Sequence, residues 1–183
     1  MLIIKCICSS VFSGFNSLNI FCLVSLESFN IDKFEKNVCI IKFVQDNESK
    51  SSKGVLRGLH FQKPPFSQAK LVRCVEGKVM DVVVDIRKGS PTYGKHIAME
   101  LSGENKRQLF IPRGFAHGFS VLSDTAVFAY KVDNTYVPAS DCGIRYDDKD
   151  LNIDWGLNHV EIKLSEKDKN LSSLKDLVSP FKF

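Results

Sequence analysis

The sequence predicts an all-β fold, an antiparallel sandwich or barrel, and three observations support this. From about residue 39 onward the apolar residues come in short runs rich in Val, Ile and Phe, bounded by turn residues. These runs recur roughly every 8–12 residues, a spacing typical of such folds. Helical periodicity is limited to short pieces at 32–37 and after Ser165. A chain of 183 residues without a linker-like stretch fits a single domain, 1–183, with a sizeable core.

The expected strands follow one another along the chain. In order, they are CIIKFVQ (39–45), KLVRCVE (70–76), VMDVVVDI (79–86), HIAMELS (96–102), RQLFIP (107–112), HGFSVLS (117–123) and AVFAYKV (126–132). A turn at Glu76-Gly77 divides one long apolar run into the second and third strands. Asp81 and Asp85 lie in apolar company in the third strand. Such carboxylates could mark a functional interior, but more often they lie at a strand edge.

Composition and charge are those of an ordinary globular protein. Hydrophobic residues make up 44% and charged residues 25%, which disfavours disorder, coiled coil and low complexity. The net charge of +4 could favour phosphate-bearing ligands, but it is too small and too dispersed to indicate nucleic acid. The six cysteines show neither the CxxC spacing of a zinc site nor the density of a disulfide scaffold, so we expect free thiols in a reducing compartment. They are Cys6, Cys8, Cys22, Cys39, Cys74 and Cys142.

The first 24 residues are apolar and Ser-rich, which calls for a comparison with targeting segments. They contain one Lys, a broken apolar run and no small-residue cleavage pattern. These features fit neither a secretory signal nor a membrane span. We therefore expect neither export nor a membrane span.

Side chains that handle protons and phosphate are concentrated between Gln45 and Asp148. They are Arg57, His60, Lys70, Arg73, His117 and Tyr130. Arg suits phosphate because its planar fork donates two hydrogen bonds at once. A lone His in a strand is more often structural than catalytic, and Tyr130 could be a core aromatic whose hydroxyl bonds a backbone group. Taken together, however, the set is an inventory for acid/base chemistry and phosphate binding.

A metal site is the alternative use of histidines in a barrel. A cupin metal cluster needs two His at a spacing of two and a Glu shortly after, whereas His60 is followed by Phe61 and Gln62. The chain has four histidines, and His60 with His117 cannot fill a three-His site. We therefore expect no catalytic metal.

Several segments with ordered spacing resemble one known family. They are GVLRGLHFQ, the strand KLVR, VVVDIRKGSPTYGK, ENKRQLFIPRGFAHGFSVLSDTA and LSEKD. From about Leu26 to Asp168 the chain resembles the dTDP-4-dehydrorhamnose 3,5-epimerases, the RmlC-like cupins. The resemblance implies a cupin-type jelly-roll β-barrel with short, mainly C-terminal helical segments. It also implies a homodimer in the cytoplasm, no cofactor, a dTDP-linked sugar substrate, and neither a membrane nor a nucleic acid as partner.

The resemblance also implies roles for individual residues. His60 matches the family's catalytic base and Asp168 matches the carboxylate that orients it. Tyr130 matches the acid on the opposite face of the sugar, and Lys70 resembles the residue that stabilises the enolate oxygen. Positions around the nucleotide and sugar are matched by Glu27, Gln45, Asn47, Arg57, His117, Tyr136 and Asp141.

The sequence departs from the family pattern at three places. The segment 1–25 is divergent and lacks the family's Asp-x-Arg-Gly, whose Arg helps to bind the nucleotide; losing one such contact costs roughly 1.5–3 kcal/mol. Asp141 stands where the family more often has Glu, and Tyr146 where it usually has Trp. We expect these changes to affect affinity and fit more than chemistry.

The function predicted is metal-free epimerisation at carbons 3 and 5 of a nucleotide-linked 4-keto-6-deoxyhexose. The ketone makes the hydrogens on both neighbouring carbons removable, because the resulting carbanion becomes an enolate, and an imidazole can take them near neutral pH. Three alternatives stay open: a carbon-3-only epimerase, a ketoisomerase on the same barrel, and a non-catalytic sugar-nucleotide-binding cupin.

Overall fold

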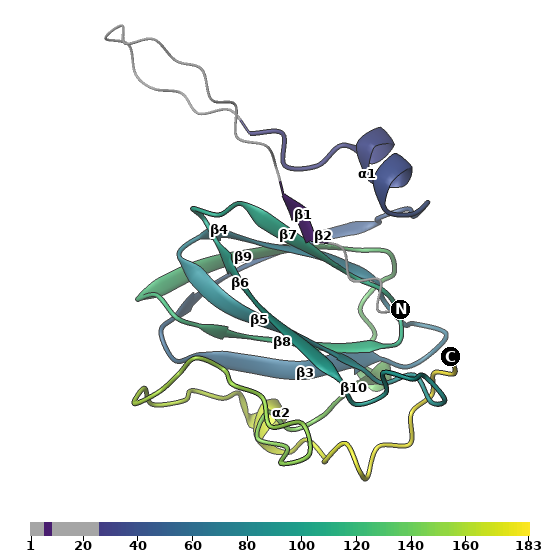
Figure 1. Ribbon diagram of the computed structural model, residues 1–183, viewed down its shortest axis with the longest axis vertical. Helices are drawn as coiled ribbons and strands as arrows, with labels where there is room; N and C mark the ends of the chain where they lie inside the picture. The colour runs from purple at the N-terminus through teal and green to yellow at the C-terminus, as the bar shows by residue number, and fades with distance from the viewer. Residues whose placement is uncertain (1–5, 9–25) are drawn as a thin grey trace, which may run out of the picture.

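Two five-stranded antiparallel sheets face each other and form most of the molecule (Figure 1). The computed structural model describes residues 6–8 and 26–183. The first sheet has the order β1-β7-β4-β9-β2 and the second the order β10-β3-β8-β5-β6. The strands are β1 (Cys6–Cys8), β2 (Gln45–Ser52), β3 (Leu56–Gln62), β4 (Lys70–Glu76), β5 (Lys78–Asp85), β6 (His96–Ser102), β7 (Arg107–Ile111), β8 (Phe115–Val121), β9 (Thr125–Val132) and β10 (Asp141–Gly143). The helices are α1 (Ile31–Asn37), the 3-10 helix η1 (Pro138–Ser140) and α2 (Glu166–Lys169).

The turn at Glu76-Gly77 is confirmed, and it carries the chain from one sheet to the other. β4 belongs to the first sheet and β5 to the second. Gly77 has a φ of 75°, and a Cβ at this position would lie 2.1 Å from the carbonyl oxygen of Thr125. The crossing therefore requires glycine.

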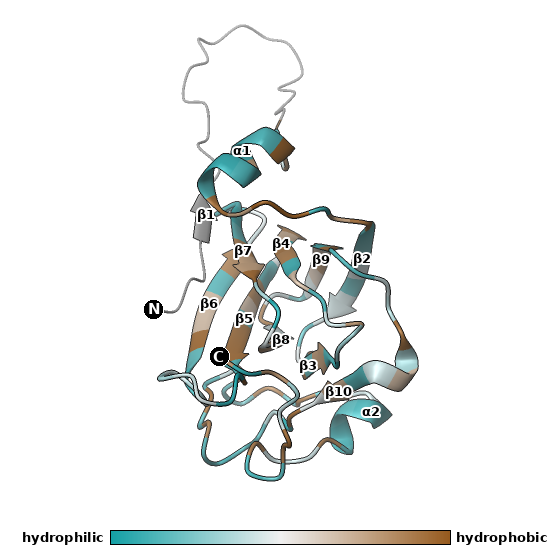
Figure 2. Cartoon of the chain, turned by 90° about the vertical axis from the view of Figure 1, so that its right-hand side faces the viewer, coloured by the Kyte–Doolittle hydropathy of each residue, from teal (hydrophilic) through white to brown (hydrophobic). Residues whose placement is uncertain are grey.

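The expected strand over 39–45 is wrong, because the strand begins where that run ends. β2 covers the polar sequence QDNESKSS and pairs with β9 along its whole length. It is an edge strand beside β9, and Figure 2 shows it largely in the hydrophilic colour. The apolar side chains of Ile41 and Phe43 instead pack beside Phe34 of α1 on the outside of the first sheet.

The buried apolar side chains form three clusters. These lie between four layers, which are α1, the first sheet, the second sheet and the C-terminal segment. One cluster lies between the sheets and includes Val72 and Phe128 from the first sheet with Val83 and Phe119 from the second. Another joins the outer face of the second sheet to the C-terminal segment, which runs beneath β3 in Figure 1. A smaller one joins α1 to the outer face of the first sheet. The alternation of each strand thus places one row of its side chains between the sheets.

Within the described part of the chain, no helix is long and apolar enough to cross a membrane. Cys39, Cys74 and Cys142 are unpaired thiols. The expectations for the other three cysteines and for the divergent segment concern residues 1–25, whose side chains lie outside the described residues.

Candidate active site

His60 enters the space between the sheets from β3 at a point where that strand is irregular. The register of β3 against β8 shifts between Arg57 and His60. Within this irregular stretch, Gly58 has a φ of 117°, and a Cβ on it would lie 2.5 Å from the Cα of Gly118. Glycine therefore allows β3 to approach β8 closely.

His60 and Asp168 form a hydrogen-bonded pair that joins β3 to α2. The Nε2 of His60 lies 2.6 Å from Oδ1 of Asp168, and the backbone N–H of Gly58 donates to the same oxygen at 3.0 Å. Ser165, the N-cap of α2, donates its hydroxyl to the other carboxylate oxygen. Burial raises the pKa of Asp168, but the hydrogen bonds from His60, Ser165 and Gly58 outweigh burial and lower this pKa to about 2. The carboxylate is thus ionised, so Nε2 carries the proton of the neutral imidazole and Nδ1 presents its lone pair.

The free nitrogen of His60 faces a second carboxylate. Its Nδ1 is buried and has no hydrogen-bond partner among the described residues. Asp141, on the short strand β10, places Oδ1 at 3.8 Å from Nδ1. The other oxygen of Asp141 accepts a hydrogen bond of 2.8 Å from the hydroxyl of Tyr136 and one from the ammonium group of Lys167. The structure therefore places Asp141 and Tyr136 beside His60, together with Lys167, which the sequence analysis did not select.

A second histidine–carboxylate pair lies deeper between the sheets. Nε2 of His117 is 2.9 Å from Oδ2 of Asp81, and both side chains are buried. Burial lowers the pKa of Lys70 to about 8; the negative charge of Asp81 opposes this shift, and the positive charge of Lys167 adds to it. Burial raises the pKa of Asp81, and His117 and Lys70 oppose that shift. The strand-edge interpretation of Asp81 is wrong, because β5 lies between β8 and β6 and this carboxylate is fully enclosed.

The remaining candidates line the first sheet and β3. Burial raises the pKa of Tyr130, and the positive charge of Arg57 opposes the shift, so these two side chains lie within electrostatic range of each other. Asn47 is paired with Tyr130 across β2 and β9 and accepts a hydrogen bond of 2.7 Å from Gln45. The phenol and the amides thus come from the adjacent strands β9 and β2 of the first sheet, and the guanidinium comes from β3 of the second sheet.

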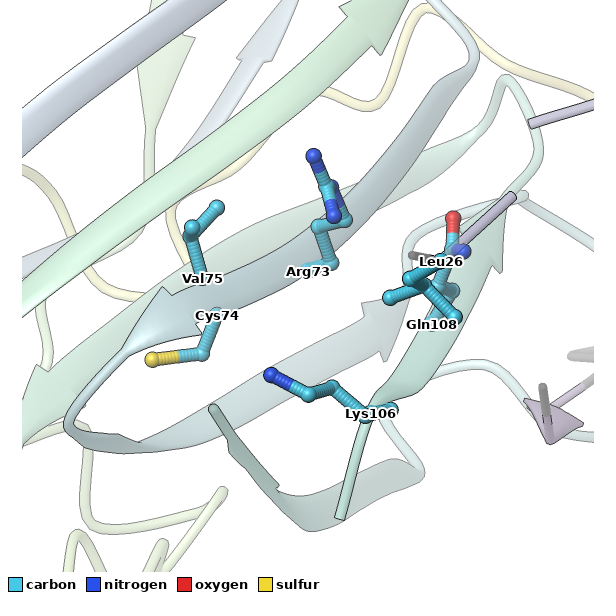
Figure 3. A pocket seen from close by; sticks show the side chains of 6 residues that line it. All are labelled: Leu26, Arg73, Cys74, Val75, Lys106 and Gln108. Atoms are coloured by element: carbon cyan, nitrogen blue, oxygen red, sulfur yellow. The ribbon is translucent and has the colours of Figure 1, made fainter. Parts of the chain in front are cut away.

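Two residues lie elsewhere. Glu27 is on the outside of the first sheet, where its carboxylate accepts hydrogen bonds from Asn30 and Lys33. Arg73 lies three residues after Lys70, and in a strand this spacing puts the two side chains on opposite faces. Arg73 lines an outer cavity of about 140 Å³ beside Leu26 (Figure 3). The structure therefore does not bring Glu27 or Arg73 to His60.

Sequence reasoning missed two groups that fix His60 and its surroundings. Ser165 and Asp168 form the reciprocal cap of α2, since the backbone N–H of Asp168 also donates to the Ser165 hydroxyl at 3.2 Å. The pattern Ser-x-x-Asp is a recognisable capping signal and could have been used. Lys167 gave no such signal, because an exposed lysine on a short helix has no distinguishing pattern.

No three His, Cys, Asp or Glu side chains converge as a metal-binding group within residues 6–8 and 26–183. The groups at His60 that could ligate a metal are its imidazole, Asp168 on one side and Asp141 on the other. Both carboxylates are already engaged by protein donors. This arrangement is suited to moving a proton at Nδ1.

Two facing antiparallel sheets with polar side chains gathered between them define the molecule as a cupin-type jelly roll. A family model described as dTDP-4-dehydrorhamnose 3,5-epimerase matches residues 24–176. The chain belongs to this family.

Individual relatives agree with that assignment. The dTDP-4-dehydrorhamnose 3,5-epimerase of Shigella flexneri is 58% identical over 146 residues, covering 79% of this chain and 80% of that protein. The enzyme of the same name from Escherichia coli strain K12 is 54% identical over 153 residues, covering 83% and 82%. The crystal structure of dTDP-6-deoxy-D-glucose-3,5-epimerase RmlC from Legionella pneumophila Philadelphia 1, in complex with dTDP-4-keto-L-rhamnose, is similar with a TM-score of 0.90 and 44% identity. The match covers 98% of this chain and 93% of that one.

Proposed function

We propose that this protein epimerises carbons 3 and 5 of dTDP-4-dehydro-6-deoxyglucose and so forms dTDP-4-dehydro-L-rhamnose. The observation that carries the proposal is the pair formed by His60 and Asp168. This pair leaves Nδ1 as a base without a protein hydrogen-bond partner among the described residues. Family membership supplies the substrate class.

His60 removes the proton from a carbon next to the ketone. Ionised Asp168 holds the imidazole in the tautomer that presents Nδ1, and it stabilises the imidazolium that forms. The electrons of the broken C–H bond move into the enolate, whose oxygen develops negative charge. Lys70 supplies a fixed cation for that oxygen, and a cation placed where charge develops stabilises the transition state more than the ground state.

Inversion requires that a new proton reach the carbon from the opposite face. Tyr130 is the proposed donor, because partial burial raises the pKa of its hydroxyl, which therefore keeps its proton at neutral pH. Arg57 binds the diphosphate, for which its planar fork is suited. Gln45 and Asn47, on the edge strand beside Tyr130, bind the nucleotide and sugar, and His117 with Asp81 forms the floor of the site.

The proposal includes a homodimer in the cytoplasm. Glu27 supports the dimer, because it is expected to bind substrate and yet lies outside the first sheet, away from His60. Contact with a second chain on that face would allow Glu27 to serve the partner's site. Light scattering should give a mass about twice the 20.6 kDa of the chain; a monomer at assay concentration would contradict this part.

The direct test is proton NMR of dTDP-4-dehydro-6-deoxyglucose in deuterated water with the purified protein. Deuterium at carbons 3 and 5 together with the L-rhamno configuration is expected. Exchange and inversion at carbon 3 alone would indicate a carbon-3 epimerase, and migration of the ketone would indicate a ketoisomerase. Binding without exchange at either carbon would indicate a non-catalytic cupin.

A further inference from the structure

Two successive inversions place a demand on the site that one inversion does not. This inference rests on the proposed function. In each inversion His60 gains a proton from carbon and Tyr130 loses one. Before the second carbon can react, Nδ1 of His60 must lose its proton to solvent and Tyr130 must regain one. The site therefore needs a route by which a proton leaves His60 while the sugar remains bound.

One side of the imidazole offers no such route. Nε2 of His60 is bonded to Asp168, whose carboxylate is buried and also holds hydrogen bonds from Gly58 and Ser165. The proton that His60 takes from carbon is moreover on the other nitrogen.

Asp141 is the acceptor on that other side. Its Oδ1 lies 3.8 Å from Nδ1, a separation that one bridging water or a small rotation of the ring converts into a hydrogen-bonded path. Before proton removal, Nδ1 of His60 and Oδ1 of Asp141 both present lone pairs, so no hydrogen bond forms between them. After removal, an N–H faces a carboxylate, so the interaction arises only in the protonated state.

The far oxygen of Asp141 leads to solvent. It accepts from Tyr136, which is 53% exposed, and from Lys167, whose side chain is 44% exposed. Both donors hold the carboxylate with one oxygen toward Nδ1 and the other toward the rim of the barrel. The hydrogen bonds from Tyr136 and Lys167 also stabilise the ionised form of Asp141, whose side chain is nearly enclosed.

We propose that Asp141 carries the proton from Nδ1 of His60 to solvent between the two inversions, and that Lys167 and Tyr136 are its positioning residues. The N–H bond at Nδ1 breaks as an O–H bond forms on Asp141, and imidazolium and carboxylate become imidazole and carboxylic acid. The acid then gives the proton to water or a buffer base, and the carboxylate is restored. No other reactant is consumed.

The charged groups that face this route come from three elements. Asp141 faces His60 on β3, Tyr136 in the segment after β9, and Lys167 on α2. Lys167 in turn is influenced by Asp168 and lies within electrostatic range of Lys70. The pH dependence of proton exit should therefore respond to removal of Lys167.

The test compares Asp141→Asn with Asp141→Glu, using dTDP-4-dehydro-6-deoxyglucose in deuterated water followed by NMR. In the Asn variant the second inversion should slow by about 10²-fold, at the low end for a lost acid/base group, so that singly inverted sugar accumulates. The deuterium content of recovered substrate should fall by a larger factor than the rate of the first inversion. The reason is that the abstracted proton stays on His60 and returns to the same carbon without exchanging with solvent. Raising the imidazole buffer concentration should restore the rate, and Glu should restore it without buffer.

Two further variants keep the test decisive. Glu166→Gln is the control: it removes an exposed carboxylate of α2, the helix that carries Lys167, and this carboxylate is paired with Lys169. The rates of both inversions and the deuterium content of recovered substrate should equal those of the wild type. Lys167→Met retains the carboxylate but removes its cation, so Asp141 should release its proton less readily and the acid limb of kcat should move to higher pH. This second readout decides the matter even if the Asn variant does not fold.

The proposal and the proposed function fail in different ways. A wild-type protein that epimerises neither carbon would refute the function. An active wild type would overturn the exit route if Asp141→Asn showed no singly inverted sugar and no buffer dependence. An unmoved acid limb in Lys167→Met would also overturn it.

Discussion

The two histidines between the sheets show how the environment separates a base from a structural group. His60 and His117 are direct partners across β3 and β8, and each is bonded to a carboxylate. The side chain of His60 is 22% exposed and its Nδ1 has no hydrogen-bond partner among the described residues. The side chain of His117 is 8% exposed and stacks on Phe128. These differences favour proton transfer at His60 and a supporting role at His117.

Tyr130→Phe should separate proton removal from inversion. The substitution deletes the proposed acid and keeps the ring that packs near Phe128. Deuterium exchange from the His60 face should continue, while inverted product falls by about 10²–10⁴, the range typical of a lost general acid. An NMR time course records both quantities, and unchanged inversion at an unchanged rate would remove Tyr130 from the mechanism.

Lys70 should set the alkaline limb of the rate. Burial lowers its pKa to about 8, and only the protonated ammonium can stabilise an enolate. We therefore expect kcat to fall as pH rises through about 8, with the cation present below that value and lost above it. Lys70→Met should lower kcat and abolish this limb, and a variant that kept the limb would assign it to another group.

Among the elements, α2 is joined to the barrel by Asp168. This carboxylate has a pKa lowered to about 2, compared with about 3.9 for an unperturbed Asp. Its contribution to stability is therefore present above pH ~4 and is lost as pH falls through about 2. Asp168→Asn should reduce the free energy of unfolding at neutral pH by about 1–3 kcal/mol.

The check is chemical denaturation of wild type and Asp168→Asn at several pH values. The difference in stability should narrow between pH ~4 and ~2 as the wild-type carboxylate becomes protonated. A constant difference across that range would show that the ionised form of Asp168 does not stabilise the fold.

The strands that the sequence predicted are those in which apolar residues face a core. β2 escaped prediction because both of its rows are polar; its order comes from pairing with β9 and not from burial. The run over 39–45 was wrongly predicted to be a strand, because its apolar side chains are packed against α1 although its backbone pairs with no strand over most of its length. Periodicity reports burial, and burial does not require a strand.

The candidate site was only partly predictable, because local sequence pattern does not encode how distant segments pack together. Motif resemblance supplied His60 and Asp168, which lie 108 positions apart in the chain and yet share a hydrogen bond. Local pattern put Arg73 and Lys70 on opposite faces of one strand but could not show which of the two faces the other sheet, nor that Asp81 is enclosed, because the packing of the two sheets decides both. Lys167 depends on how α2 packs, which no local signal encodes.

At the scale of the whole molecule, the C-terminal segment completes the site by covering the second sheet. Trp155 and Leu174 in this segment join the cluster on the outer face of that sheet, next to Leu59. The same segment carries α2 and hence Asp168. Stability of the outer layer and orientation of His60 are therefore coupled.

Activity should survive exhaustive chelation. The described residues offer no converging set of metal ligands, and the carboxylates beside His60 are engaged by protein donors. Epimerisation measured before and after dialysis against a chelator should agree. Loss of activity that a divalent metal restores would contradict a metal-free mechanism.

Deuterium exchange by His60→Ala tests the central claim most directly, because the account assigns both proton removals to this one imidazole. With dTDP-4-dehydro-6-deoxyglucose in deuterated water, the variant should show no exchange at carbon 3 or carbon 5 above the uncatalysed rate. Binding of dTDP, measured by calorimetry, should stay close to wild type, because Arg57, Gln45 and Asn47 are retained. Exchange at either carbon near the wild-type rate would contradict the account.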